Sequence, residues 1–430
     1  MYKIKSVIRV PGRSALTRTI LMSLLFSFLT LYFFISHKII WLLYLSFLVI
    51  IAAARMKITI KPVIVLLLVA LPLLWALLMS GQSDLYHFSQ GFFYLSIPLI
   101  MIITGYQLSK IFSLHQFFIS IVIIGIITAI LFIILTVISA GFAAFLSPYT
   151  EARFVVASGS SVCILSLITA AYSEYFGIKI FKKKKGKYLA VIINLIAIYL
   201  FASRTYWVFL FVFVILFSLK TLRRNKLLFA GFMLIAVLLI SLSVIGSKEG
   251  LTFQNSILYK LINSFKEVKV RDITDYEYIN LYFRGYEAYR SWVTFSESSL
   301  LHKVLGGGYG KLVTLDAEVL LDGKYWNAVP WVHNGFFFIL VKEGLLGIVF
   351  ALLFFFYLSR ESIKGYRKDT CQRQYARLVL LGCTITLFVA NYVVCGLFSH
   401  EMAILLISIG FLLSGLKQNG TEHEITSYKN

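Results

Sequence analysis

The chain has 430 residues, of which 59% are hydrophobic and only 14% are charged. A water-soluble domain could not bury that much apolar surface, so the composition excludes an ordinary soluble protein. The formal net charge is +22. Nucleic-acid binding is nevertheless not favoured, because the basic residues are dispersed over segments that flank apolar runs instead of forming one patch.

Twelve apolar runs approach the ~20 residues that an α-helix needs to cross a bilayer. Their residues do not alternate between apolar and polar, which favours helices over a β-barrel. We therefore predict an all-α polytopic membrane protein of about 12 transmembrane helices, a single integral membrane domain over 1–430. The runs are 20–36, 39–54, 62–80, 93–108, 117–139, 155–173, 188–202, 205–219, 227–246, 332–358, 378–397 and 402–416.

The placement of charge predicts the topology. If the N-terminus is cytoplasmic, the inner segments carry 27 Lys and Arg against five acidic residues, so the whole net charge lies on one side. Basic loops stay in the cytoplasm during membrane insertion. We expect both termini and the run Lys182–Lys185 to be cytoplasmic, and 247–331 to be a large extracytoplasmic loop between the ninth and tenth spans.

Residues 188–219 are too long for one membrane pass and short for two, although basic segments flank both ends. Two short passes would turn near Ser203-Arg204 and hold Arg204 at the outer boundary of the membrane. An arginine there is costly unless it is paired or faces a wet cavity. The alternative is an arginine that merely anchors the tip of a helical hairpin.

The loop 247–331 is predicted to form a mostly helical cap. Apolar residues recur at helical spacing over 255–269, and a second helix is expected over 276–295. The second helix is rich in Tyr and Trp, which indicates either an aromatic belt at the membrane surface or a platform for stacking sugars. It also carries Arg284, which alone would be an ordinary surface arginine.

Two segments after this helix have unusual composition. Gly306-Gly307-Gly308-Tyr309-Gly310 predicts a flexible turn that allows close approach to a ligand, but it lacks the Lys-Ser/Thr pair of a phosphate-binding loop. On an ideal helix over 332–358, His333 lies about 20° from Gly344 and about 40° from Gly347. These glycines permit close helix packing and would turn His333 toward the bundle.

Glu343 flanks the same face, and Lys342 points to the other side. A lone histidine at a membrane interface is usually only an anchor, so His333 needs further support as a catalytic group. We find no Ser-His-acid arrangement and no cluster with metal-ligand spacing. None of the four cysteines lies in the long loop or forms a CxxC pair, so neither a disulfide nor a zinc site is expected.

These features occur in an order that resembles the O-antigen ligase/O-antigen polymerase superfamily of bacterial membrane glycosyltransferases. The resemblance is supported by motifs over about residues 188–358. The most specific of them is the last along the chain, His333-Asn334 with Glu343-Gly344 and Gly347. Arg290 is an alternative to Arg284, since the surrounding sequence is loose. The matching features are Ser203-Arg204, Arg284 with Trp292, the glycine turn 306–310, and His333-Asn334 with Glu343-Gly344 and Gly347.

The resemblance implies metal-independent, inverting glycosyl transfer without a cofactor, on the outer face of the cytoplasmic (inner) membrane. The donor would be a glycan on undecaprenyl pyrophosphate. Arg204 and Arg284 would bind its pyrophosphate, and His333 would be the general base. Arg290, Asn334 and Glu343 are secondary candidates, while Gly344 and Gly347 would serve helix packing.

The acceptor separates two activities within this family. A polymerase transfers the glycan to another lipid-linked repeat unit, and a ligase transfers it to a lipid A–core sugar. The sequence carries no acceptor-specific signal, and we favour the polymerase. A protein that regulates chain length is a candidate partner, besides the membrane lipid.

The alternative from another functional class is a flippase or transporter of lipid-linked oligosaccharides. Such a protein would not need an 85-residue outer loop, and its two halves would more often show a sequence repeat.

Overall fold

A computed structural model of the chain describes residues 63–81, 84–145, 160–201, 203–221, 267–273, 275, 278–279, 282–321 and 324–418. The predicted spans 20–36, 39–54 and 227–246 lie outside the described residues, as does most of the predicted helix 255–269. Each of the other predicted spans overlaps a helix. The described chain is mostly helical, as predicted, while the total of twelve spans stays a prediction.

The longer helices are α3 (Val63–Leu78), α4 (Leu85–Ile111), α5 (Leu114–Ala140), α7 (Ser160–Tyr172), α8 (Lys184–Leu200), α9 (Arg204–Thr221), α13 (Phe283–Ser296), α14 (Leu300–Leu305), α15 (Gly335–Ile363), α16 (Cys371–Val394) and α17 (Ala403–Gln418). Short 3-10 helices are η1 (Phe142–Phe145), η2 (Ser173–Phe176), η4 (Tyr366–Lys368), η5 (Gly396–Phe398) and η6 (His400–Met402). Two strands, β1 (Val313–Leu321) and β2 (Lys324–Val329), form an antiparallel hairpin.

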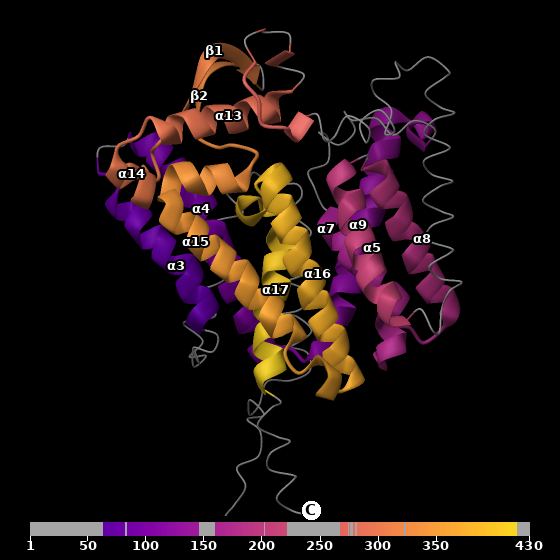
Figure 1. Ribbon diagram of the computed structural model, residues 1–430. Helices are drawn as coiled ribbons and strands as arrows, with labels where there is room; N and C mark the ends of the chain where they lie inside the picture. The colour runs from indigo at the N-terminus through magenta and orange to yellow at the C-terminus, as the bar shows by residue number, and fades with distance from the viewer. Residues whose placement is uncertain are drawn as a thin grey trace, which may run out of the picture.

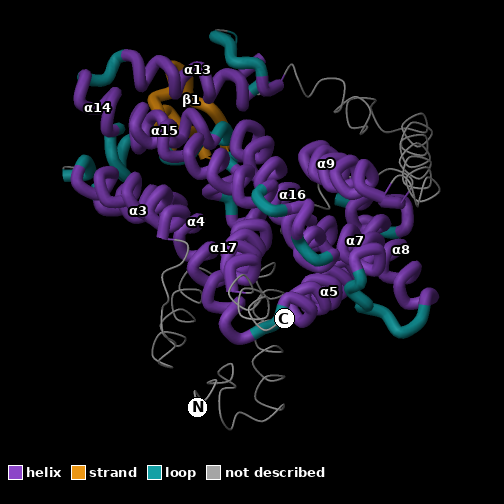
Figure 2. The backbone as a smooth tube through the Cα atoms, turned by 60° about the horizontal axis from the view of Figure 1, so that its bottom comes forward, coloured by secondary structure: helices purple, strands orange, loops and turns teal. Residues whose placement is uncertain are grey.

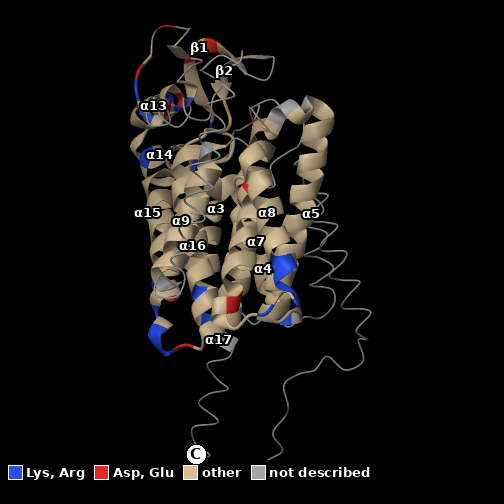
Figure 3. Ribbon diagram, turned by 90° about the vertical axis from the view of Figure 1, so that its right-hand side faces the viewer, with Lys and Arg blue, Asp and Glu red and all other residues tan. Residues whose placement is uncertain are grey.

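Several helices have the length and composition of membrane spans. Among the described residues, four segments are long and apolar enough to cross a bilayer. Charged residues lie mostly at the two ends of the helix bundle, and its middle is nearly free of them (Figure 3). This distribution fits a protein embedded in a membrane. The four segments are Leu85–Lys110, Leu114–Ser139, Gly335–Lys368 and Cys371–Val394.

The helices form two groups joined by α16 and α17. The first group holds α3, α4 and α15, and the second holds α5, α7, α8 and α9 (Figure 1). The view toward the end of the bundle shows α16 and α17 between the groups (Figure 2). The helix α13 and the hairpin lie across one end, over the first group. The part of the loop that these elements form is therefore placed as a cap over one half of the bundle.

Small residues bring α4 and α17 into close contact. A Cβ added at Gly105 would lie 1.9 Å from the carbonyl oxygen of Ile407, and one added at Gly410 would lie 2.1 Å from that of Ile102. Backbones approach this closely in membrane bundles only where side chains are absent.

The predicted pair of short helices is also present, since α8 ends at Leu200 and α9 begins at Arg204.

The helix α15 is bent at Gly344, which has a φ of 71° and a ψ of −167°. The bend removes helical partners from the carbonyl groups of Val341 and Lys342. The backbone N–H groups of Gly307 and Gly308 donate to these two carbonyls at 2.9 and 3.0 Å. The glycine turn therefore closes the bend in α15 instead of lining an open ligand site. The expectation that His333, Gly344 and Gly347 share one face of an unbroken helix is wrong.

The hairpin corrects the prediction of a helical loop, because two strands follow its helices. Its buried side chains alternate along β1, with Val313, Leu315 and Val319 facing inward and Asp316 facing outward. Such period-two alternation is typical of a half-buried strand. The pairing runs from Val313 opposite Val329 to Leu321 opposite Lys324, with an irregularity between Thr314 and Val319. The preceding helix, α13, begins at Phe283, later than the predicted start at 276.

Candidate functional site

The imidazole of His333 is held by a buried carboxylate from the loop helix. Glu287 in α13 is 1% exposed, and its Oε2 accepts hydrogen bonds from the backbone N–H of His333 at 2.7 Å and from Nδ1 of the same residue at 2.9 Å. His333 precedes α15, which begins two residues later. Its orientation is therefore set by Glu287 and not by glycines on its own helix.

This arrangement fixes the tautomer of a neutral His333. A carboxylate accepts hydrogen bonds and cannot donate them, so the proton of the imidazole lies on Nδ1 and the lone pair on Nε2. The side chain of His333 is 30% exposed, which leaves the ring accessible. The rings of Trp331 and Phe283 meet the imidazole edge-on, with centroids 4.8 and 6.1 Å away. The ring is oriented by a buried acceptor and flanked by aromatic side chains.

The aromatic contacts of His333 extend through Trp331 to a helix of the bundle. Tyr94 of α4 contacts Trp331 with ring centroids 6.1 Å apart. Cys395, at the end of α16, is fully buried near Glu287 and Trp331. Cys395 is thus a packing group next to the His333–Glu287 pair.

Asn334 and Gly335 fix the start of α15. The Asn334 side chain accepts hydrogen bonds from the backbone N–H groups of Phe336 at 3.0 Å and Phe337 at 3.3 Å, so it is the N-cap of the helix. A Cβ at Gly335 would lie 2.0 Å from Oδ1 of Asn391 in α16. The pair His333-Asn334 therefore combines a candidate base with the residue that begins the next helix.

Arg284 lies on α13 one helical turn before Glu287. Its Nε is 3.4 Å from Oε1 of Glu267, and each of these side chains is about one quarter exposed. The spacing of three residues puts Arg284 and Glu287 on adjacent turns of one helix face, and the partial exposure of Arg284 leaves it within reach of solvent. A guanidinium offers five N–H donors in a planar fork, which suits a phosphate oxygen as well as a carboxylate.

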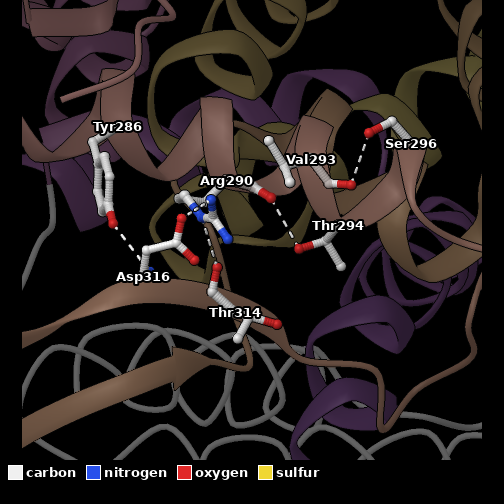
Figure 4. Close-up of polar contacts among 7 residues, drawn as sticks. All are labelled: Tyr286, Arg290, Val293, Thr294, Ser296, Thr314 and Asp316. Atoms are coloured by element: carbon white, nitrogen blue, oxygen red, sulfur yellow. Dashed lines mark hydrogen bonds and ion pairs between the residues drawn. The ribbon is translucent and has the colours of Figure 1, made fainter. Parts of the chain in front are cut away.

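Arg290, the alternative to Arg284, ties α13 to the hairpin. Its side chain is buried, Nε donates to the carbonyl oxygen of Thr314 at 3.0 Å, and Nη1 donates to the carboxylate of Asp316 (Figure 4). The backbone N–H of Asp316 donates to the Tyr286 hydroxyl at 3.2 Å, and burial raises the pKa of that hydroxyl. These contacts give Arg290 a structural role between helix and strand.

Arg204 is the first residue of α9, and its backbone is described but its side chain is not. The neighbouring Tyr206 donates its hydroxyl to Oε2 of Glu401 at 2.5 Å. Glu401 lies in the connection between α16 and α17, where the backbone N–H of Leu397 also donates to Oδ1 of Asn391. Since Asn391 contacts Gly335, this connection places the starts of α9 and α15 at the same end of the bundle.

Glu343 and Lys342 are buried at the bend of α15, more than two helical turns from Asn334. Nζ of Lys342 donates to the carbonyl oxygen of Tyr309 at 2.7 Å, which accounts for a lysine in an apolar helix. Glu343 borders a small apolar cavity that is also lined by Pro72 of α3 and Gly347. The structure does not bring Glu343 to His333.

Two acidic residues of this region were not identified from the sequence. Glu287 lies on the buried face of α13 together with Tyr286, Arg290 and Ser291, so a helical projection of the loop could have indicated it. Glu401 comes in a polar interruption between two apolar runs, directly after His400. An acidic residue between membrane spans is a reasonable site candidate.

No protein-family model matches the chain, and no curated protein shows significant sequence similarity to it.

The four cysteines are free thiols. Within the described ranges, no three His, Cys, Asp or Glu side chains come together as they would around a metal ion. The function must therefore be argued from the geometry of the His333–Glu287 pair and its neighbours.

Proposed function

We propose that the protein is a membrane glycosyltransferase that polymerises oligosaccharide repeat units linked to undecaprenyl pyrophosphate. The reaction would take place on the outer face of the cytoplasmic (inner) membrane and would be inverting and metal-independent. The observation that carries this proposal is the His333–Glu287 pair, an accessible imidazole oriented by a buried carboxylate at the end of a membrane helix bundle.

His333 would act as the general base. Its Nε2 accepts the proton of the acceptor hydroxyl while that oxygen attacks the anomeric carbon of the donor. The bond between the anomeric carbon and the pyrophosphate oxygen breaks, and its electron pair leaves with the lipid pyrophosphate. Glu287 stabilises the imidazolium that forms, because its carboxylate accepts the Nδ1–H at 2.9 Å.

Arg284 and Arg204 would stabilise the leaving group. Negative charge grows on the pyrophosphate as the bond breaks, so arginines that contact it lower the energy of the transition state more than that of the bound donor. Arg284 lies one turn from Glu287 on α13, and the backbone of Arg204 begins α9 at the same end of the bundle. The two positions are on different elements and would approach the donor from two sides.

The same donor site serves a ligase, in which the acceptor is a lipid A–core sugar. The deciding experiment supplies purified protein in lipid nanodiscs with a lipid-linked repeat unit, alone or together with a lipid A–core acceptor. A ladder of products from the repeat unit alone supports the polymerase, and a capped acceptor without a ladder supports the ligase. The proposal is overturned if neither product forms, or if the His333→Ala variant forms either of them at the native rate.

The proposed orientation has a separate test. Asp316 on β1 has a side chain that is 70% exposed, so a cysteine in its place should be labelled readily. In intact cells stripped of their outer barrier, a membrane-impermeant thiol reagent should label D316C, whereas K183C near the α7–α8 connection should react only after lysis. Labelling of D316C from the cytoplasmic side alone would contradict a reaction on the outer face.

A further inference from the structure

The turn between α15 and α16 lies at a membrane boundary. Both helices are candidate spans, so residues 364–370 between them must emerge at one surface of the bilayer. This surface is at the end of the bundle opposite α13 and the hairpin (Figures 1 and 3). The turn is therefore far from the His333–Glu287 pair, and no role in glycosyl transfer has been assigned to it.

The turn holds an open pocket of about 540 Å³ with both basic and apolar lining residues. The basic ones are Arg367, Lys368 and Arg377, and the apolar ones are Ile363, Leu378 and Leu381. A soluble anion would need only the basic residues, whereas a ligand with a charged head and a hydrocarbon part matches both kinds.

Arg377, a lining residue of the pocket, is fixed by two hydrogen bonds. Its Nε donates to the carboxylate of Asp369, and its Nη1 donates to the carbonyl oxygen of Glu361. Arg373 also approaches Asp369, with Nη1 3.8 Å from Oδ1. Two arginines thus share one carboxylate, so the cluster keeps a positive charge where an anion would enter.

Arg367 and Lys368 supply the remaining charge. Both are exposed, and none of the carboxylates that the structure describes lies within ion-pair distance of either side chain. Gly365 precedes them with a φ of 76°, so the chain turns sharply and presents them on the short helix η4. Two unneutralised cations are thereby held beside a fixed guanidinium and an apolar wall.

We infer that this pocket binds the headgroup of an anionic phospholipid, with its phosphodiester between Arg367, Lys368 and Arg377. The acyl chains would continue along Leu378, Leu381 and Ile363 into the bilayer. Phosphate oxygens accept hydrogen bonds from arginine in paired, directional geometry, and basic pockets between membrane helices are typical sites for such headgroups. The inference does not depend on the proposed glycosyl transfer.

The test compares binding of defined lipids to delipidated, detergent-purified protein. Phosphatidylglycerol and cardiolipin should bind and raise the melting temperature, whereas phosphatidylcholine should not. The Arg367→Gln, Lys368→Gln double variant should bind phosphatidylglycerol roughly 30-fold more weakly, at about fivefold for each basic side chain. These two residues are exposed, so the fold should be unaffected, and circular dichroism checks this.

A matched control removes the same charge elsewhere. Lys182 and Lys183 are exposed near the start of α8, outside the pocket, and their double replacement by Gln should change binding less than twofold. Equal losses in both double variants would overturn the inference, because they would indicate diffuse attraction to a basic surface. Inorganic phosphate that binds as tightly as phosphatidylglycerol would also overturn it, since the apolar wall would then contribute nothing.

Discussion

Replacement of Glu287 by Gln tests the central geometric feature of the proposed site. One oxygen of Glu287 accepts hydrogen bonds from both the backbone N–H and Nδ1 of His333, at 2.7 and 2.9 Å. Glutamine keeps an amide oxygen that can accept both of these bonds when it takes the place of Oε2. Its NH₂ group then replaces Oε1, and the negative charge that faces the imidazole is lost.

The expected loss follows from the missing charge. A hydrogen bond to a charged group contributes about 1.5–3 kcal/mol and one between neutral groups about 0.5–1.5 kcal/mol, so about 1–1.5 kcal/mol is lost when the imidazolium forms in the transition state. Turnover should therefore fall roughly 5- to 12-fold, at about 1.4 kcal/mol for each tenfold. The KM for the lipid-linked donor should change little, because Glu287 is buried and would not contact the pyrophosphate.

The assay is initial-rate formation of the glycan ladder at saturating donor, with protein folding followed by thermal melting. Glu297 provides a matched control, since it lies at the end of the same helix and is exposed. Glu297→Gln should retain native turnover. A supporting role of Glu287 for His333 is refuted if Glu287→Gln turns over within twofold of the native protein while His333→Ala is inactive, or if the defect of Glu287→Gln is confined to the donor KM.

Three further results are expected. Arg284→Ala and Arg204→Ala should each remove most activity, and Arg204→Lys should restore little, because lysine lacks the bidentate fork; native activity of either alanine variant in the ladder assay would contradict this. Arg290→Gln should lower the free energy of unfolding by about 1–3 kcal/mol, mainly through the bond to the strand carbonyl, since Asp316 is largely exposed. Gly344→Ala should lower the melting temperature, because φ at this position is 71° and a Cβ would lie 2.4 Å from the backbone of the glycine turn. An unchanged melting curve would exclude that strain.

The helical part of the fold was largely predictable because long apolar runs have few structural solutions. The short pair α8 and α9 was found from length and flanking charge alone, with the turn at the predicted position near Ser203-Arg204. The hairpin was missed although β1 alternates from Val313 to Val319 and is followed by Asp-Gly, a pair typical of two-residue turns.

The site was only partly predictable. His333 was singled out, but its partner Glu287 is 46 residues earlier in the chain and meets it only through tertiary packing. The choice between Arg284 and Arg290 depends on where β1 lies, because the Thr314 carbonyl is an acceptor for Arg290 only once that strand has formed. The glycine turn was identified as unusual, yet its partner is a bend in α15 that no sequence pattern indicated.

Three contacts hold the described part of the loop together and against α15. Glu287 binds the residue before Asn334, Arg290 fixes α13 against the hairpin, and the glycine turn completes the bend at Gly344. A catalytic group works only when its neighbours hold it within a fraction of an ångström of its working position. The loop residues therefore hold His333 in position, and do not only cover the end of the bundle. Arg290→Gln is therefore expected to reduce turnover in the ladder assay by loosening α13, even though Arg290 is directed at the strand and not at His333.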